Sequence, residues 1–251
     1  MTETTEELAP TVDVRRAGDR FKTRLRWLDS KHSFSFSRHY DPLNTHHGLL
    51  LVNNDDIVTP GTGFETHPHQ DMEIVTWVLQ GSLVHQDSTG HSGIIYPGLA
   101  QRMSAGTGIL HSEKNASTTD PVRFIQMWVP PDVSGIAPGY QQNEIADELL
   151  DGRLATIASG MPGHDAAITI HNRSAALRGA RLASGESLEL PAAPYLHLFV
   201  ARGRLTMPAT DNGAELAEGD AVRFTAANGI RVMADQASEI LVWEMHAALG
   251  G

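Results

Sequence analysis

Two short stretches of the sequence carry side chains that could bind a metal ion. The first, HPHQDME, places His67 and His69 two residues apart and Glu73 four residues further on. The second, HSE, places His111 and Glu113 two residues apart. Residues two apart in a β-strand point to the same face, about 6.5–7 Å from each other. Each stretch therefore offers several ligand-type side chains to one face of its strand.

The two stretches together indicate a metal site more strongly than either does alone. A single His-x-His pair on a strand is usually only part of a polar face, and a single His-x-Glu pair is weaker evidence still. Here both are flanked by glycine turns and runs of β-forming residues. If the two strands lie across a barrel from each other, three imidazoles and one carboxylate could surround one cation. That ligand set suits divalent iron, copper, nickel, zinc or manganese, and spacing alone leaves open whether Glu73 or Glu113 supplies the carboxylate.

The segments around these stretches have the pattern of short β-strands. HSFSFSRHY (32–40) alternates aromatic and small polar residues, HHGLLLVNNDD (46–56) is strongly apolar, and VRFIQMWVPP (122–131) ends in two prolines that stop a strand. DPLN and TPGTG between them are turn signals. With 23 glycines and 13 prolines among 251 residues, turns must be frequent and the elements short. This pattern favours an all-β architecture.

The second half of the chain repeats the order of elements in the first half. Three pairs of segments correspond in the same order: EIVTWVLQGSL with LHLFVARGRL, IIYPGLAQRMSAGTGIL with ELAEGDAVRFTAANGIRV, and FIQMWVP with EILVWEMH. Such a repeat predicts two similar β domains in tandem.

We therefore expect a flexible acidic N-terminus (1–12), an N-terminal metal-binding domain (13–130), a connector rich in proline and glycine (131–165) and a C-terminal domain (166–251). Within the connector, NEIADELL (143–150) is the best helix candidate, because its apolar residues would share one face.

Composition and charge argue against several kinds of partner. The formal net charge is −11 and no compact Lys/Arg cluster offsets it, so no direct binding to nucleic acid is expected. The chain has no cysteine, which excludes disulfides and thiolate metal sites. The segment MTETTEELAP is acidic and lacks the apolar core of a secretion signal. No apolar run approaches the ~20 residues of a membrane span, so no membrane association and a cytoplasmic location are expected.

The metal-ligand stretches resemble the two motifs of the cupin superfamily. The first motif, G-x5-H-x-H-x3/4-E-x6-G, is followed with one extra residue before the last glycine by Gly61, His67, His69, Glu73 and Gly81. The end of the second motif, G-x2-H-x3-N, is matched by Gly108, His111 and Asn115, although the usual P-x-G just before the histidine is absent.

Within this superfamily the chain resembles the pirin family. The segments that carry this resemblance are HSFSFSRHYDP, HPHQDMEIVTWVLQGSLVHQDS and PGLAQRMSAGTGILHSEKN. The resemblance covers residues 13 to about 130 strongly. The remainder is similar, more loosely, to the C-terminal cupin of bacterial quercetinase-type proteins.

The resemblance implies a bicupin, that is, two tandem antiparallel β-barrel (jelly-roll) domains, the second a degenerate copy without metal. It also implies that His67, His69, His111 and Glu113 bind one divalent metal, usually Fe(II), with Cu, Ni, Mn and Zn as alternatives. Glu73 then does not bind the metal and is expected beside the ligands or at the rim of the site.

The pirin resemblance further implies a dioxygenase that opens flavonols such as quercetin with O2. Glu113 would act as a ligand and as the base that takes the proton of the flavonol 3-hydroxyl. A second possibility is a non-enzymatic iron redox sensor that regulates a protein partner, either a transcription factor or a metabolic enzyme. A third is another enol-bearing small molecule as the substrate. We expect a monomer.

Several further histidines are weighed against a site role. His46 and His47 could line the mouth of the site, although an exposed turn is the favoured interpretation. His85 is expected to be a hydrogen-bonded structural residue. His197 stands where the repeat would place a metal histidine, but it lacks a His-x-His partner. No site is predicted for His164, His171 and His246.

Residues near the predicted strands could also wall a pocket. One of Gln126 and Met127 is expected to face the cavity of the barrel. Met103, Phe64 and Trp128 are expected in the core, with some of them forming walls of the pocket.

Overall fold

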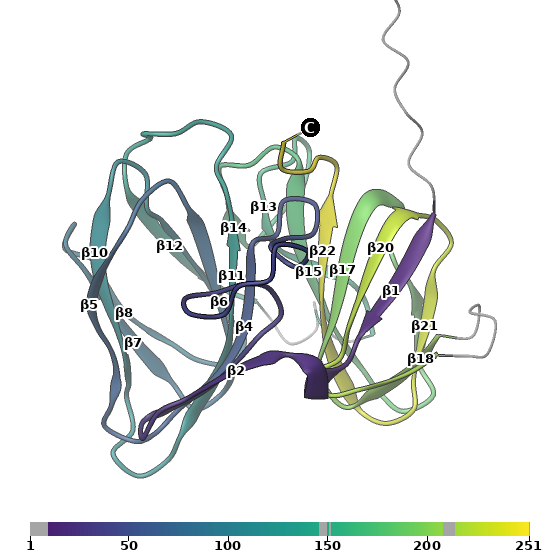
Figure 1. The fold of residues 1–251 in the computed structure, drawn as a ribbon, viewed down its shortest axis with the longest axis horizontal. Helices are drawn as coiled ribbons and strands as arrows, with labels where there is room; N and C mark the ends of the chain where they lie inside the picture. Colours follow the sequence, from purple (N-terminus) through teal and green to yellow (C-terminus); the bar gives the residue numbers. More distant parts are fainter. Residues whose placement is uncertain (1–9, 146–149, 151, 208–213, 251) are drawn as a thin grey trace, which may run out of the picture.

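The protein forms two β domains that lie side by side (Figure 1). The computed structural model describes residues 10–145, 150, 152–207 and 214–250. Within them the chain forms strands β1 to β22 and one 3-10 turn, η1 (Ala17–Asp19). The predicted all-β bicupin fold is confirmed. Residues 146–149, which hold much of the predicted helix, lie outside the described residues, and Asn143 and Glu144 belong to a strand.

The first domain contains a seven-stranded and a four-stranded antiparallel sheet. The large sheet runs in the order β12 (Gly139–Glu144), β9 (Leu99–Ser104), β6 (Glu73–Gln80), β11 (Val122–Val129), β4 (Val52–Val58), β3 (Leu28–His32) and β2 (Phe21–Arg24). The small sheet runs in the order β5 (Gly63–His69), β10 (Ile109–Asn115), β7 (Leu83–Asp87) and β8 (Ser92–Ile95).

The second domain repeats this arrangement, apart from one parallel pair of strands at the edge of its large sheet. Its large sheet runs in the order β1 (Thr11–Arg15), β20 (Ala221–Ala227), β17 (Ala193–Arg202), β22 (Ser238–Met245), β15 (Ala175–Leu182), β13 (Ala155–Ser159) and β14 (Ile168–Thr169). Its small sheet runs in the order β16 (Ser187–Glu189), β21 (Arg231–Ala234), β18 (Arg204–Met207) and β19 (Ala214–Ala217). The segments matched in the sequence occupy equivalent strands: β6 with β17, β9 with β20, and β11 with β22.

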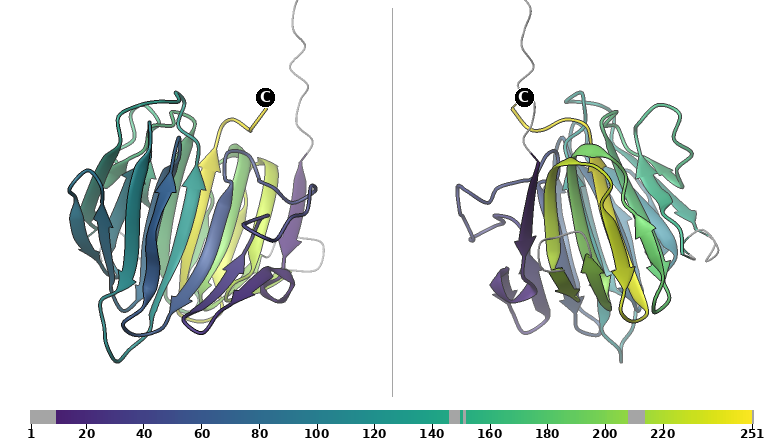
Figure 2. Two further views of the ribbon diagram at one scale, coloured as in Figure 1. Left: turned by 60° about the vertical axis from the view of Figure 1, so that its left-hand side comes forward. Right: turned by 90° about the vertical axis from the view of Figure 1, so that its right-hand side faces the viewer.

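Two edge strands join a sheet that their position in the sequence does not suggest. Strand β1 pairs with β20 and so closes the large sheet of the second domain, where Figure 2 shows it in purple beside the green and yellow strands. Strand β12, which follows the first domain in the sequence, pairs with β9 of that domain. Strand β13 pairs with β15 across residues 165/166. Pairing therefore crosses the predicted limits at 12/13, 130/131 and 165/166, because an open sheet edge can be capped by any segment that reaches it.

The two large sheets pack face to face, and this contact decides which residues face the first barrel's interior. One apolar cluster joins Val75, Trp77 and Leu79 of β6 to Phe199 and Trp243 of the second domain. Because side chains alternate along a strand, the even-numbered residues of β6 point into the barrel instead. No helix among the described residues is long and apolar enough to span a membrane.

Candidate metal centre

Strands β5 and β10 bring three predicted ligands together. The strands are antiparallel neighbours in the small sheet, and His111 lies directly opposite His67. The ring centroids are 4.4 Å apart for His67 and His111, 4.8 Å for His67 and His69, and 4.9 Å for His69 and His111. The sequence suggested that the two strands lie across a barrel from each other. Instead they are neighbours in one sheet and share backbone hydrogen bonds.

Glu113 joins this cluster through an irregularity in the pairing. The register of β10 against β5 shifts between His111 and Glu113, and Glu113 then pairs with Phe64. Among the described residues, two groups of possible ligands have their ligand atoms within 4.8 Å of one another. One is His67, His69 and His111, the other is His85, His111 and Glu113. The two groups share His111, which therefore connects Glu113 to the His-Pro-His pair in one cluster of possible ligands.

The hydrogen bonds of the histidines fit a metal ion. Nδ1 of His67 donates to the carbonyl oxygen of Glu65 at 2.7 Å, which leaves Nε2 as its free ligand atom. Nε2 of His111 is buried and has no hydrogen-bond partner among the described residues. A buried polar atom without a partner is costly unless something binds it. Imidazole nitrogens with a nearby carboxylate suit a divalent first-row metal.

Burial keeps His69 and His111 in the neutral form that metals bind. Desolvation, reinforced by His67, lowers the pKa of His69 to about 4. Desolvation and the neighbouring His67 and His69 lower the pKa of His111 to about 2. Burial raises the pKa of Glu113 to about 7, although Nε2 of Gln126 opposes this by donating to Oε2 at 2.8 Å. A bound cation would favour the charged carboxylate.

A cavity of about 290 Å³ opens beside these side chains, between the large and the small sheet of the first domain. His67, His69, Glu113 and Gln126 line it together with four aromatic residues, Trp27, Phe36, Phe64 and Trp128. Another part of the wall, from β2, β3 and β4, carries polar side chains, namely Thr23, Ser30, His32, Asn54 and Asp56. Flat aromatic walls with polar groups at defined places are typical of a small-molecule site.

The polar wall contains a buried carboxyl group that the sequence did not reveal as a candidate. Burial, the largest influence, raises the pKa of Asp56 to about 7, and Oδ1 has no hydrogen-bond partner among the described residues. Nearby, a hydrogen bond of 2.9 Å connects Nδ1 of His32 to Oδ1 of Asn54. Asn54 and Asp56 stand two apart in the polar run NNDD of β4, so they point to the same face, and this spacing is the sequence signal that could have identified them.

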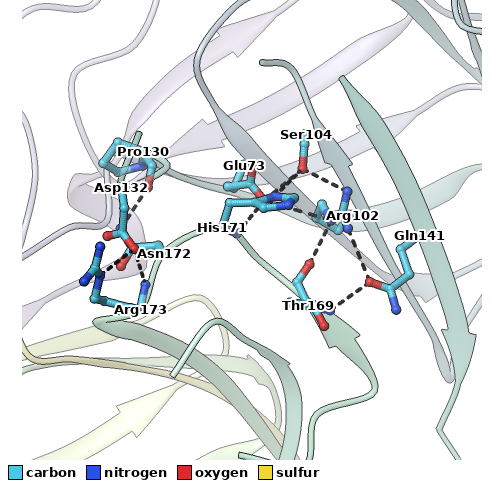
Figure 3. A network of polar contacts seen from close by, with 10 residues as sticks. All are labelled: Glu73, Arg102, Ser104, Pro130, Asp132, Gln141, Thr169, His171, Asn172 and Arg173. Carbon is cyan, nitrogen blue, oxygen red and sulfur yellow. Dashed lines mark hydrogen bonds and ion pairs between the residues drawn. The ribbon is translucent and has the colours of Figure 1, made fainter. Parts of the chain in front are cut away.

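Glu73 lies outside the site, on the opposite face of the large sheet. Its Oε2 accepts hydrogen bonds from the Ser104 hydroxyl and from the backbone N–H of His171, both at 3.0 Å (Figure 3). The Arg102 guanidinium is 3.9 Å away. The expectation that Glu73 stands beside the ligands or at the rim is therefore wrong, because β6 turns this side chain toward the second domain.

The other candidate residues separate in the same way. Gln126 faces the cavity, whereas Met127 belongs to the apolar contact between the domains. His197 also lies at this contact, 5.8 Å from the Phe34 ring, so it does not occupy a metal position of the second barrel. His47 donates through Nε2 to the carbonyl oxygen of Phe224 at 3.1 Å, which places it against the second domain. Of the remaining candidates, Phe64 and Trp128 lie in the cavity wall, Met103 is buried in the core and His46 is exposed.

Comparison with known proteins identifies the family. The family model described as Pirin matches residues 13–129, and the one described as Quercetinase C-terminal cupin domain matches residues 156–245. A protein named putative quercetin 2,3-dioxygenase from Mycobacterium tuberculosis is 65% identical over 243 residues, covering 97% of this chain and 98% of that protein. The quercetin 2,3-dioxygenase of Escherichia coli K12 is 35% identical over 235 residues, covering 93% and 98%.

A solved structure gives the same result. The crystal structure of the bacterial pirin YhhW from Escherichia coli in complex with nickel(II) superposes with a TM-score of 0.86 at 34% identity, covering 95% of this chain and all of that one. Together with the sequence relatives and the two matched family models, this likeness shows that the chain belongs to the pirin family.

Proposed function

We propose that this protein is a metal-dependent dioxygenase that opens flavonols such as quercetin with O2. The proposed ligands are His67, His69, His111 and Glu113, and the proposed metal is iron(II). The observation that carries the proposal is the aromatic-walled cavity of about 290 Å³ that His67, His69 and Glu113 line, with the ligand atoms of His111 clustered beside them. The names of the relatives and the nickel(II) complex of a bacterial pirin support it.

The cavity suits a flat, polyhydroxylated aromatic molecule. Trp27, Phe36, Phe64 and Trp128 would pack against its rings and exclude water from the reacting end. On the other wall, the buried carboxyl of Asp56 has a free oxygen that could hydrogen-bond a phenolic hydroxyl. A flavonol carries hydroxyl groups at both ends of a planar ring system, so both walls would be engaged.

Glu113 is the proposed base. Its carboxylate is buried, and Gln126 holds Oε2, which leaves Oε1 to take the proton of the flavonol 3-hydroxyl. When bound, the metal supplies a Lewis acid that makes a coordinated hydroxyl more acidic. In the overall reaction the heterocycle opens, both atoms of O2 enter the ester product and carbon monoxide leaves.

The test is aerobic turnover of quercetin by protein whose metal content has been measured. Protein purified without added metal is first analysed for its elements and then loaded with iron(II), with nickel(II) in a parallel sample. We expect loss of the flavonol absorbance with one carbon monoxide released per quercetin. His67→Ala should abolish the activity, whereas Glu73→Gln, on the opposite face of the sheet, should retain it. Metal-replete protein that leaves quercetin unchanged would refute the proposal.

A further inference from the structure

The metal ligand His111 is joined to a second buried histidine and a buried carboxylate. Nδ1 of His111 lies 3.4 Å from Nδ1 of His85, and Nε2 of His85 lies 3.1 Å from Oδ2 of Asp87. We propose that Asp87 and His85 are positioning residues that fix the tautomer of His111, so that His111 offers Nε2 to the metal. The inference rests on the ligand set proposed above, but it does not depend on any oxidation of a flavonol.

Asp87 is the fixed end of this chain of contacts. It begins the turn DSTG, in which Oδ1 accepts hydrogen bonds from the backbone N–H of Thr89 at 2.8 Å and from the Thr89 hydroxyl at 2.6 Å. Its side chain is fully buried. Burial alone would raise the pKa of Asp87, but the hydrogen bonds from Thr89 and His85 outweigh it and lower the pKa to about 2. The group is therefore an acceptor at neutral pH.

The direction of each proton follows from the donor and acceptor roles. A carboxylate only accepts, so the hydrogen between His85 and Asp87 must sit on Nε2 of His85. The two Nδ1 atoms face each other, and they cannot both carry a hydrogen at 3.4 Å without a clash. With its hydrogen on Nε2, neutral His85 has a lone pair on Nδ1, and His111 donates to it. Nε2 of His111, the buried atom without a partner, is then left with its lone pair free for a metal.

The surrounding side chains hold His85 in this orientation. The Tyr140 ring of β12 stacks on the His85 ring with centroids 4.8 Å apart and an angle of 27° between the planes. A Cβ atom on Gly93 would come within 2.7 Å of the Tyr140 hydroxyl oxygen, so glycine at that position leaves room for the stack. Carboxylates that act through a ligating histidine commonly orient the ring and raise its basicity as a ligand.

A competing arrangement uses the same residues. His85, His111 and Glu113 could themselves surround a cation, because their ligand atoms also lie within 4.8 Å of one another. In that case His85 would bind the metal through Nδ1, and His111 would use the nitrogen that faces it. The two arrangements predict opposite tautomers for His111 and different numbers of histidine ligands.

The direct test is nitrogen-15 NMR of the histidine rings in the full-length protein, metal-free and loaded with zinc(II). We expect His111 to carry its proton on Nδ1 and His85 to carry its proton on Nε2 in both forms. A His111 protonated on Nε2 in the metal-free protein, or a zinc-bound Nδ1 of His85, would overturn the proposal. This measurement needs no variant and no substrate, so it is separate from the fate of the dioxygenase proposal.

The matched variants are Asp87→Asn and Glu73→Gln. Both replace a fully buried carboxylate that contacts a histidine, but only Asp87 is connected to His111. The amide introduced by Asp87→Asn can donate as well as accept, so we expect both tautomers of His85 and zinc(II) affinity weakened ~10–100-fold in a chelator competition. Glu73→Gln should leave the His85 and His111 signals and the affinity unchanged. Unchanged affinity and tautomers in Asp87→Asn, or equal losses in both variants, would refute the role of Asp87.

Discussion

His197, buried between the two domains, should make the protein sensitive to acid. Its ring lies beside Phe34, and neither ring nitrogen has a hydrogen-bond partner among the described residues. The Arg223 guanidinium, 4.3 Å from the Phe34 ring centroid, adds positive charge nearby. Desolvation first, and then the charges of Arg223 and His47, lower the pKa of His197 well below 6.5. We expect His197→Leu to remove a specific part of the pH dependence of stability.

The magnitude follows from the linkage between protonation and unfolding. In the unfolded chain a histidine takes up a proton below pH ~6.5, whereas in the folded protein His197 stays neutral. The unfolded state then binds more protons, so the free energy of unfolding falls as the pH falls. At pH 5.0 this difference amounts to about 2 kcal/mol for one histidine that is neutral in the fold. Leucine cannot be protonated, so the variant lacks this loss. When the pH falls from 7.5 to 5.0, the free energy of unfolding of the wild type should therefore fall by about 2 kcal/mol more than that of the variant.

The assay is urea unfolding of metal-free wild type and His197→Leu at both pH values. Metal-free samples are used so that acid release of a metal does not contribute to the difference. His46→Leu is the control, because the His46 side chain is exposed in the folded protein. The reasoning is refuted if the free energies of unfolding of wild type and His197→Leu fall in parallel with pH.

Three further predictions test the site and the domain contact. Glu113→Ala should weaken metal binding more than ~100-fold in a chelator competition, since loss of a residue that only contacts a ligand already lowers metal affinity ~10–100-fold. Glu73→Ala should leave metal affinity unchanged. A larger loss in Glu73→Ala than in Glu113→Ala would contradict the ligand set. Asp56→Asn should lower kcat/KM about tenfold for quercetin but not for a flavonol without hydroxyls on its pendant ring, and equal losses would exclude a contact to those hydroxyls. Trp77→Phe removes the 2.7 Å hydrogen bond to Glu239 across the domain contact and should cost about 1 kcal/mol of unfolding free energy in a urea titration; an unchanged midpoint would contradict that value.

Most elements and their repetition could be predicted from the sequence because their signals are local. The strand predicted at HSFSFSRHY (32–40) is wrong, since β3 ends at His32 and the rest of this segment forms turns. Runs of β-forming, mostly apolar residues define strands such as β6 and β17, and a glycine follows each of them. Gly81 and Gly203 have φ angles of 75° and 88°, a conformation that glycine adopts without strain. The same turn in the same place of each half therefore marks two copies of one fold.

The ligand residues could also be proposed from the sequence, but their arrangement could not. Counting by twos along HPHQDME assigned Glu73 to the face of His67 and His69. The count fails at Asp71, whose φ angle of 47° interrupts the extended chain, and β6 then begins in the other sheet with its own facing. Similarly, the shift in register after His111 depends on how β10 pairs with β5, which is a relation between two distant segments.

The sequence by itself thus determined the all-β class, the tandem repeat and the histidines that could bind a metal, because strand alternation, turns and two-residue spacing are short-range properties. Only the tertiary structure decided that Glu73 faces the second domain, that Asp56 lines the cavity, and that β1 joins the large sheet of the second domain while β12 joins that of the first. It also decided that His85 and Asp87 reach His111. These outcomes depend on which strands pair and which faces pack, and both are long-range contacts that no local pattern encodes.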